Sequence, residues 1–134
     1  MELIDKIRAA KRVYIIGNGG SYANAAHLAN DLLACGIPAF TLDAASLTAT
    51  ANDFGYGETF SRWLQTVGQR GDLLIALSGS GRSPNILQAI KVAEGLGMDV
   101  YRLFGAELGQ DMQQAENHQL VIGHELMRAL RVRR

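Results

Sequence analysis

Apolar residues along the chain alternate between the pattern of a buried strand and that of a helix. Short apolar runs, typical of strands buried on both faces, predict strands at 12–16, 38–42, 73–77 and 99–104. Around them, apolar residues recur every three or four positions, which predicts helices at 2–10, 22–35, 58–67, 84–96 and about 110–131. Residues 43–52 are small and rich in hydroxyls, and this ambiguous stretch suggests one helical turn.

The alternation of strands and helices decides the expected fold class. Strands separated by helices pair in parallel through right-handed crossovers. We therefore expect an α/β fold, a three-layer α/β/α sandwich around a parallel, flavodoxin-like or Rossmann-like sheet of four to five strands. The chain has 134 residues, 48% of them hydrophobic, and no internal repeat or low-complexity linker. A single domain over residues 1–134 is the expectation.

Charge and cysteine content narrow the classes of partner and compartment. Thirteen basic residues balance thirteen acidic ones, so nothing general attracts the chain to nucleic acid or to a membrane surface. No uncharged run approaches the roughly 20 residues that span a bilayer, and the first apolar residues alternate with charges, unlike a signal peptide. The lone Cys35 excludes an internal disulfide and fits a reducing compartment. We expect a cytoplasmic protein without nucleic-acid or membrane partners.

A glycine-rich turn, Gly17-Asn18-Gly19-Gly20-Ser21, follows the first predicted strand and precedes a helix. Glycines let the backbone approach a ligand, and the free N–H groups of the first helical turn face it, so this arrangement favours an anion. Ser21 stands at the expected N-cap, with a hydroxyl available to a phosphate oxygen. The turn lacks the third glycine of a dinucleotide-binding motif and the Gly-Lys pair of a P-loop, so a nucleotide site is not expected. The alternative is a turn that binds nothing.

A second turn, residues 78–83, follows the strongest strand and leads to Pro84 at a favourable first helical position. Ligands of open parallel sheets bind at the carboxyl ends of the strands. Together the two turns offer two sets of helix N–H groups and four hydroxyls, those of Ser21, Ser78, Ser80 and Ser83. Paired cradles favour a phosphate monoester over two merely structural turns.

The sequence resembles the sugar isomerase (SIS) phosphosugar-binding domain and, within that family, the phosphoheptose (sedoheptulose 7-phosphate) isomerases. The resemblance rests on GNGGS at 17–21, His27, NDFGYGETFSR at 52–62, GDLLIALSGSGRSPNILQAI at 71–90, and Glu116 and His124. It implies that the Ser-rich turns hold the phosphate and that polar residues nearby line the sugar. The implied substrate-binding residues are Asn18, Gly19, Gly20, Ser21, Asn52, Asp53, Ser78, Gly79, Ser80, Ser83 and Glu116.

Four residues are candidates for acid–base or metal chemistry. His27 and Asp31, four residues apart, share one helical face, and Glu116 and His124 share a ridge of the last helix. Spacing alone favours a surface pair for the first two, and a histidine paired with a carboxylate is the alternative for His124. The resemblance implies that Asp31 is the base, one methylene shorter than the glutamate usual in the family, and that His124 is its acid–base partner. It further implies one Zn²⁺ per site, held by His27, Asp31, Glu116 and His124.

The implied reaction is the conversion of sedoheptulose 7-phosphate to D-glycero-D-manno-heptose 7-phosphate through an enediol. Two features favour the alternative, a non-catalytic phosphosugar-binding module of the sensor or replication-initiator-associating type. Gly79 replaces the threonine usual in the family, and the segment between Phe104 and Glu116 is abridged. Of the long N-terminal helical segment of the family, only residues 2–10 are present. Because these lost segments normally take part in oligomer contacts, the resemblance implies a homodimer or homotetramer with active sites near subunit interfaces.

Overall fold

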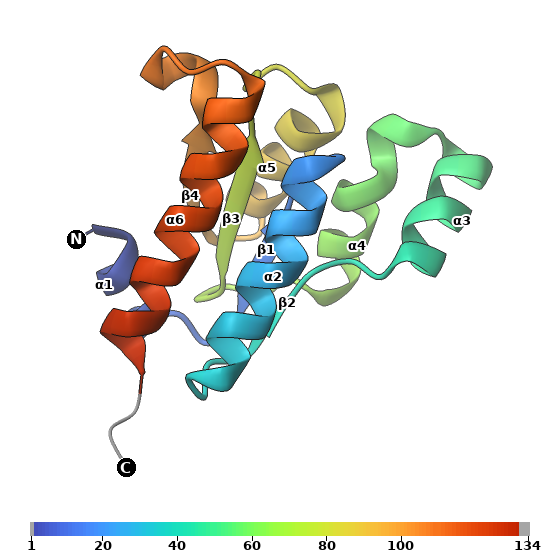
Figure 1. Cartoon of the computed structure of the whole chain (residues 1–134). Helices are drawn as coiled ribbons and strands as arrows, with labels where there is room; N and C mark the ends of the chain where they lie inside the picture. The colour runs from blue at the N-terminus through green and yellow to red at the C-terminus, as the bar shows by residue number, and fades with distance from the viewer. Residues whose placement is uncertain (1, 132–134) are drawn as a thin grey trace.

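The computed structural model describes residues 2–131 and contains a four-stranded, wholly parallel sheet. The strands are β1 (Val13–Ile16), β2 (Ala39–Phe40), β3 (Leu73–Ser78) and β4 (Asp99–Phe104). Their order across the sheet is β2-β1-β3-β4 (Figure 1). The predicted α/β class and the four strands are confirmed. β2 is shorter than the predicted 38–42, because only two of its residues pair with β1 at the sheet edge.

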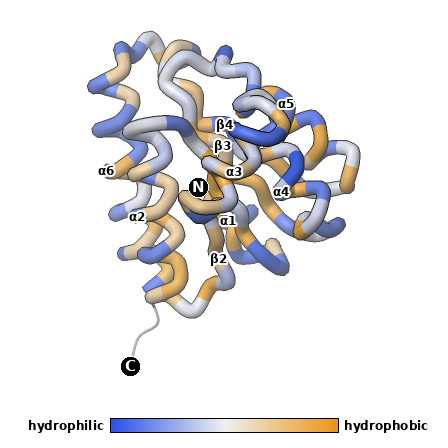
Figure 2. The backbone as a smooth tube through the Cα atoms, turned by 90° about the vertical axis from the view of Figure 1, so that its right-hand side faces the viewer, coloured by the Kyte–Doolittle hydropathy of each residue, from blue (hydrophilic) through white to orange (hydrophobic). Residues whose placement is uncertain are grey.

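Helices cover both faces of the sheet, as the three-layer prediction requires (Figure 1). On one face lie α1 (Glu2–Ala9), α2 (Gly20–Ala34) and α6 (Met112–Leu130), and on the other α4 (Thr59–Val67) and α5 (Pro84–Gly95). Successive strand residues alternate between the layers: Val13 and Ile15 pack with the first group, Tyr14 and Ile16 with the second. Figure 2 shows hydrophobic strands inside and alternating hydropathy along the helices.

Local capping explains where two helices begin. Residues 43–52, ambiguous in sequence, belong to α3 (Ala44–Phe54), eleven residues rather than one turn. The Asp43 side chain accepts a hydrogen bond from the Ser46 N–H at 3.0 Å, which caps this helix. Helix α2 begins at Gly20, and its N-cap is Gly19 with φ of 57°. The predicted N-cap role of Ser21 is therefore wrong, because Ser21 lies inside the first turn and is 2% exposed.

The connection between β4 and α6 fixes the last helix against the second Gly/Ser turn. It contains a 3₁₀ segment, η2 (Gly105–Leu108), and ends at the Asp111 side chain, which caps α6 reciprocally with Gln114. The Ala106 N–H donates to the carbonyl of Gly79 at 2.8 Å, and a Cβ built on Gly105 would overlap Ala115 of α6. Helix α6 then runs beside α2 (Figure 1).

None of the helices found between residues 2 and 131 combines the length and the apolar character needed to cross a membrane.

Candidate active site

Both Gly/Ser turns lie at the carboxyl ends of neighbouring strands, β1 and β3, and together line a small cavity of about 40 Å³. We call this cavity the cradle. The four serines predicted to hold a phosphate all contribute to it, and its lining consists of Asn18, Ser21, Leu77, Ser78, Gly79, Ser80, Ser83 and Met112. The structure thus brings together hydroxyls that are up to 62 positions apart in sequence (83 − 21).

Hydroxyl groups of the second turn accept hydrogen bonds from their own backbone. Ser78 Oγ accepts from the Gly81 N–H at 2.9 Å, and Ser80 Oγ from the Arg82 N–H at 3.1 Å. An accepting hydroxyl keeps its own hydrogen for another acceptor. Both serines can therefore donate to an anion in the cradle.

Met112 partly fills the space beside the second turn. A Cβ built on Gly79 would overlap the Met112 thioether, so the methionine takes up room that a larger residue at position 79 would need. Met112 is 55% exposed and its thioether is flexible, so its side chain can move to admit a larger group. Sequence reasoning assigned Met112 no role.

Asn18 belongs to a network of amides and hydroxyls between the first turn and the second layer of helices. Its Nδ2 donates to Asn85 Oδ1 and its Oδ1 accepts from Asn85 Nδ2, both at 2.9 Å. Asn18 Oδ1 also accepts from the Tyr56 hydroxyl at 2.9 Å, and Asn85 Nδ2 donates to Thr59 Oγ1 at 3.2 Å. Since Asn85 and Thr59 are buried, this network holds Asn18 in one orientation.

A larger cavity of about 210 Å³ lies on the other side of Asn18, and its walls are Gly17, Asn18, Gly19, Tyr22, Ala44, Leu47, Thr48 and Tyr56. Asn52 and Asp53, which the resemblance places on the sugar, line neither this cavity nor the cradle. They lie exposed near the end of α3, where Asn52 Nδ2 donates to Asp53 Oδ1 at 3.1 Å. The structure places both residues outside these two cavities, and their role at the sugar stays a prediction.

Polar residues also meet along the contact between α2 and α6, which starts at the cradle. A Cβ built on Gly20 would overlap the carboxylate of Glu116, so this carboxylate lies directly against the start of α2. One turn further along, Asn24 Nδ2 donates to the Glu116 carbonyl at 3.0 Å and to Gln119 Oε1 at 2.9 Å. Gln119 and Asn24 escaped the sequence analysis.

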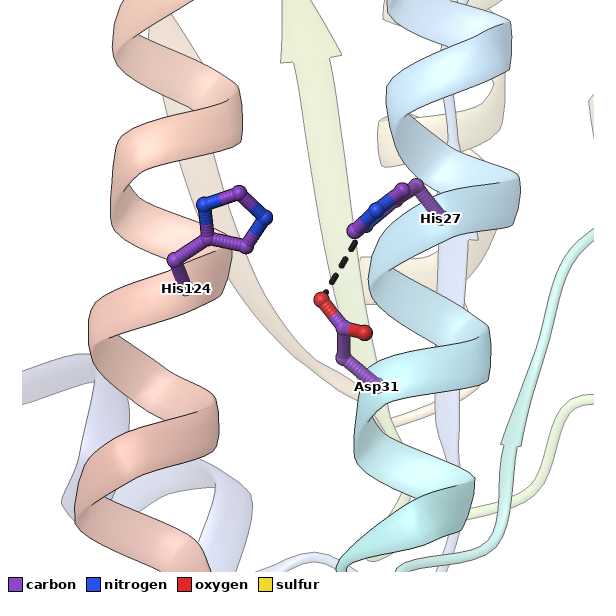
Figure 3. Close-up of side chains that lie close together, drawn as sticks. All are labelled: His27, Asp31 and His124. Carbon is purple, nitrogen blue, oxygen red and sulfur yellow. Dashed lines mark ion pairs between the residues drawn. The ribbon is translucent and has the colours of Figure 1, made fainter.

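His27, Asp31 and His124 converge at the middle of the same contact (Figure 3). The two α2 side chains point towards His124, which reaches across from α6. One potential ligand atom from each lies within 4.8 Å of those from the others, and the imidazole rings are 5.3 Å apart between centroids. Glu116 is not part of this group among the described residues, because its carboxylate lies at Gly20 instead.

The chemistry of these three side chains fits a divalent metal. The Asp31 carboxylate is 7% exposed, and its Oδ2 lies 3.0 Å from His27 Nδ1. That oxygen nevertheless lacks a hydrogen bond of acceptable geometry within residues 2–131, which leaves a buried acceptor facing two imidazoles. Two histidines, one carboxylate and an open fourth position form one of the ligand sets of catalytic Zn²⁺ sites. The three residues can therefore hold such an ion without Glu116.

Fold and site together define a class of protein: a parallel α/β domain with a paired anion cradle and a histidine–carboxylate group on the adjoining helices. Comparison with known proteins gives the family. Residues 2–105 match the model of the SIS domain. Phosphoheptose isomerase from Campylobacter concisus (strain 13826) is 41% identical over 128 residues, covering 89% of this chain and 67% of that protein. The enzyme of the same name from Yersinia pestis (strain Pestoides F) is 40% identical over 115 residues, covering 81% and 60%.

Comparison with solved structures points to the same family. Phosphoheptose isomerase from Francisella tularensis superposes with a TM-score of 0.86 at 25% identity, covering 96% of this chain and 82% of that one. GmhA, the phosphoheptose isomerase of Neisseria gonorrhoeae, gives 0.83 at 25% identity, covering 96% and 80%. The chain belongs to the SIS domain family, and within it to the phosphoheptose isomerases. It spans 67% and 60% of the length of the two curated relatives.

Proposed function

We propose that the protein converts sedoheptulose 7-phosphate to D-glycero-D-manno-heptose 7-phosphate. The observation that carries this proposal is the arrangement of the site on two adjoining helices. The cradle contains Ser21 at the start of α2, and the same helix carries His27 and Asp31 opposite His124. A phosphate held at one end of this contact positions the remainder of the substrate along it, towards a base and an acid.

Proton transfers at two neighbouring carbons complete the reaction. Asp31 removes a proton from carbon 1 while His124 protonates the carbonyl oxygen on carbon 2, which gives the enediol. Asp31 then returns its proton to carbon 2 while His124 takes the proton of the carbon-1 hydroxyl, which gives the aldehyde and restores both groups. Burial of Asp31 keeps water from competing for this carboxylate.

Zn²⁺ is the proposed cofactor, with His27, Asp31 and His124 as its ligands; Asp31 would keep its second carboxylate oxygen, and His124 its second ring nitrogen, for proton transfer. Such an ion polarises a carbonyl and stabilises an enediolate. The buried Asp31 Oδ2 without a hydrogen bond supports the assignment. Zn²⁺ should bind at one ion per chain and raise the midpoint of thermal unfolding. Asp31→Asn should abolish that rise, and an equal rise in this variant would contradict the ligand assignment.

Self-association is also proposed, as a homodimer or homotetramer. If Asn52 and Asp53 contact the sugar, as the resemblance implies, they do so at the site of another copy, because they line neither cavity of their own chain. The neighbouring Phe54 is 54% exposed, and Leu33 on α2 and Val121 on α6 are 53% and 51% exposed. Light scattering should give a mass at least twice that of the chain, and a monodisperse monomer would contradict this proposal. A cytoplasmic location remains a prediction.

One observation favours a second candidate, a phosphosugar-binding module without catalysis. Met112 beside Gly79 restricts the cradle, and the resemblance implies a threonine at position 79 in the enzymes. A module would bind sugar phosphates without converting them.

Turnover of sedoheptulose 7-phosphate, with and without Zn²⁺, distinguishes the two candidates. The enzyme proposal expects product from the wild-type protein. It also expects a loss of at least about 100-fold in kcat for His124→Ala, since general acid–base groups contribute ~10²–10⁴-fold, with sugar-phosphate affinity retained. His118→Ala is the matched control, because His118 lies on α6 and contacts Gln110 instead. Tight binding without turnover would establish the module and refute the enzyme.

A further inference from the structure

Two amide side chains connect α6 to the hydroxyl of Ser21. Gln119 Nε2 donates to Ser21 Oγ at 3.1 Å, and Gln119 Oε1 accepts from Asn24 Nδ2 at 2.9 Å. Asn24 Nδ2 donates in addition to the backbone carbonyl of Glu116 at 3.0 Å. Gln119 is 4% exposed and Ser21 is 2% exposed, so water does not replace these partners.

The backbone carbonyl of Glu116 sets the direction of the whole chain of hydrogen bonds. A carbonyl oxygen only accepts, so the Asn24 atom that faces it must be the NH₂ group. The Gln119 atom beside that NH₂ group must then be the amide oxygen, which turns the Gln119 NH₂ group towards Ser21. Neither amide can rotate by half a turn without placing two donors or two acceptors against each other.

This direction determines what the Ser21 hydroxyl can do. Its oxygen already accepts from Gln119, and its hydrogen has no acceptor in hydrogen-bonding geometry among residues 2–131. Ser21 also lines the cradle. We infer that Gln119, held by Asn24, is a positioning residue that makes Ser21 a hydrogen-bond donor to the substrate phosphate. The inference rests on the proposed function, which places the phosphate in the cradle.

Gln119→Glu tests the direction of the bonds, because the two side chains have nearly the same size. An ionised carboxylate only accepts, so it would take the Ser21 hydrogen away from the phosphate. We expect the Kd for inorganic phosphate and the KM for sedoheptulose 7-phosphate to rise about tenfold, the effect of one hydrogen bond to a charged group. Because the hydrogen bonds of the Gln119 side chain go to Ser21 and Asn24 and not to Asp31 or His124, kcat should change less than threefold.

A double-mutant cycle with Ser21→Ala separates positioning from the added charge. In the Ser21→Ala background no hydroxyl remains to be reoriented, so Gln119→Glu should raise Kd by much less than tenfold. Gln113→Glu is the matched control: the same substitution at an exposed position of α6, with the same change in net charge. It should change Kd less than threefold.

Asn24→Ala provides a second variant if the buried carboxylate of Gln119→Glu prevents folding. It removes the donor that fixes the Gln119 amide. It should raise the Kd for inorganic phosphate about threefold in the wild-type background and leave it unchanged in the Ser21→Ala background. An equal effect of either substitution in both Ser21 backgrounds would overturn the inference, as would equal effects of Gln119→Glu and Gln113→Glu. If the folded wild-type protein bound neither phosphate nor sugar phosphate, the proposed function would fail as well, so the two failures are distinguishable.

Discussion

Replacing Asn85 by alanine removes the residue that joins the first Gly/Ser turn to α4 and α5. Asn85 is 2% exposed and makes three hydrogen bonds, two with the Asn18 amide at 2.9 Å and one with Thr59 Oγ1 at 3.2 Å. After truncation, Asn18 Nδ2 has no partner in the network. Asn18 Oδ1 keeps the Tyr56 hydroxyl, and Thr59 keeps its bond to the Tyr56 carbonyl.

The expected loss follows from these three bonds. Each contributes about 1 kcal/mol net, which gives about 3 kcal/mol for the set. Alanine is the better helix former by roughly 0.5 kcal/mol, so the free energy of unfolding should fall by about 2–3 kcal/mol. For a domain of this size the midpoint of thermal unfolding should fall by roughly 6–12 °C. Because Asn18 lines both cavities, the KM for the sugar phosphate should rise as well.

Urea unfolding followed by circular dichroism measures this loss, with linear extrapolation to water. Gln88→Ala on the exposed side of the same helix is the matched control and should stay within about 0.5 kcal/mol of wild type. A loss below about 1 kcal/mol for Asn85→Ala, or one equal to the control, would show that the amide pair does not hold the turn.

Three further outcomes follow from other contacts. Glu116→Gln should lower the KM for sugar phosphate, measured by steady-state kinetics, because it removes a negative charge from the start of α2 beside the cradle. The hydrogen bond from Lys6 at 2.7 Å lowers the pKa of Asp99, so this carboxylate stabilises the fold above its unfolded pKa of about 3.9. Asp99→Asn should therefore lower the free energy of unfolding by less than about 1 kcal/mol at pH 7. In unfolding experiments at decreasing pH, this difference from wild type should vanish as the pH falls through the lowered pKa of Asp99. Burial raises the pKa of the Cys35 thiol, so thiol reagents should label native protein far more slowly than unfolded protein at pH 7.

Much of the fold could be predicted from the sequence because each strand is a separate apolar run followed by a turn signal. The exceptions have local causes. Pairing of β2 is limited to Ala39–Phe40, and no hydrophobic pattern marks where an edge strand stops pairing. Helix α3 was underestimated because its small residues carry little amphipathic signal, while the cap supplied by Asp43 was overlooked.

The site was less predictable where it depends on contacts between distant segments. The serines of the cradle could be found because each belongs to a recognisable turn. Asn85 and Gln119 have no such local signal, since their partners lie 67 and 98 positions away. One clue was available for Gln119: it lies four residues after the buried Ala115 on the inward stripe of α6, where a polar residue requires a partner.

In the proposed reaction, helix α2 fixes the distance between a phosphate in the cradle and the groups proposed to transfer protons. His27 lies six positions after Ser21 and Asp31 lies ten positions after it, which corresponds to about 9 Å and 15 Å along a helix. Since this spacing is set by the helical rise, no loop movement can adjust it. Under the proposed function, the helix would therefore select substrates by length. A sugar phosphate whose carbonyl lies too close to its phosphate would occupy the cradle and still not reach Asp31.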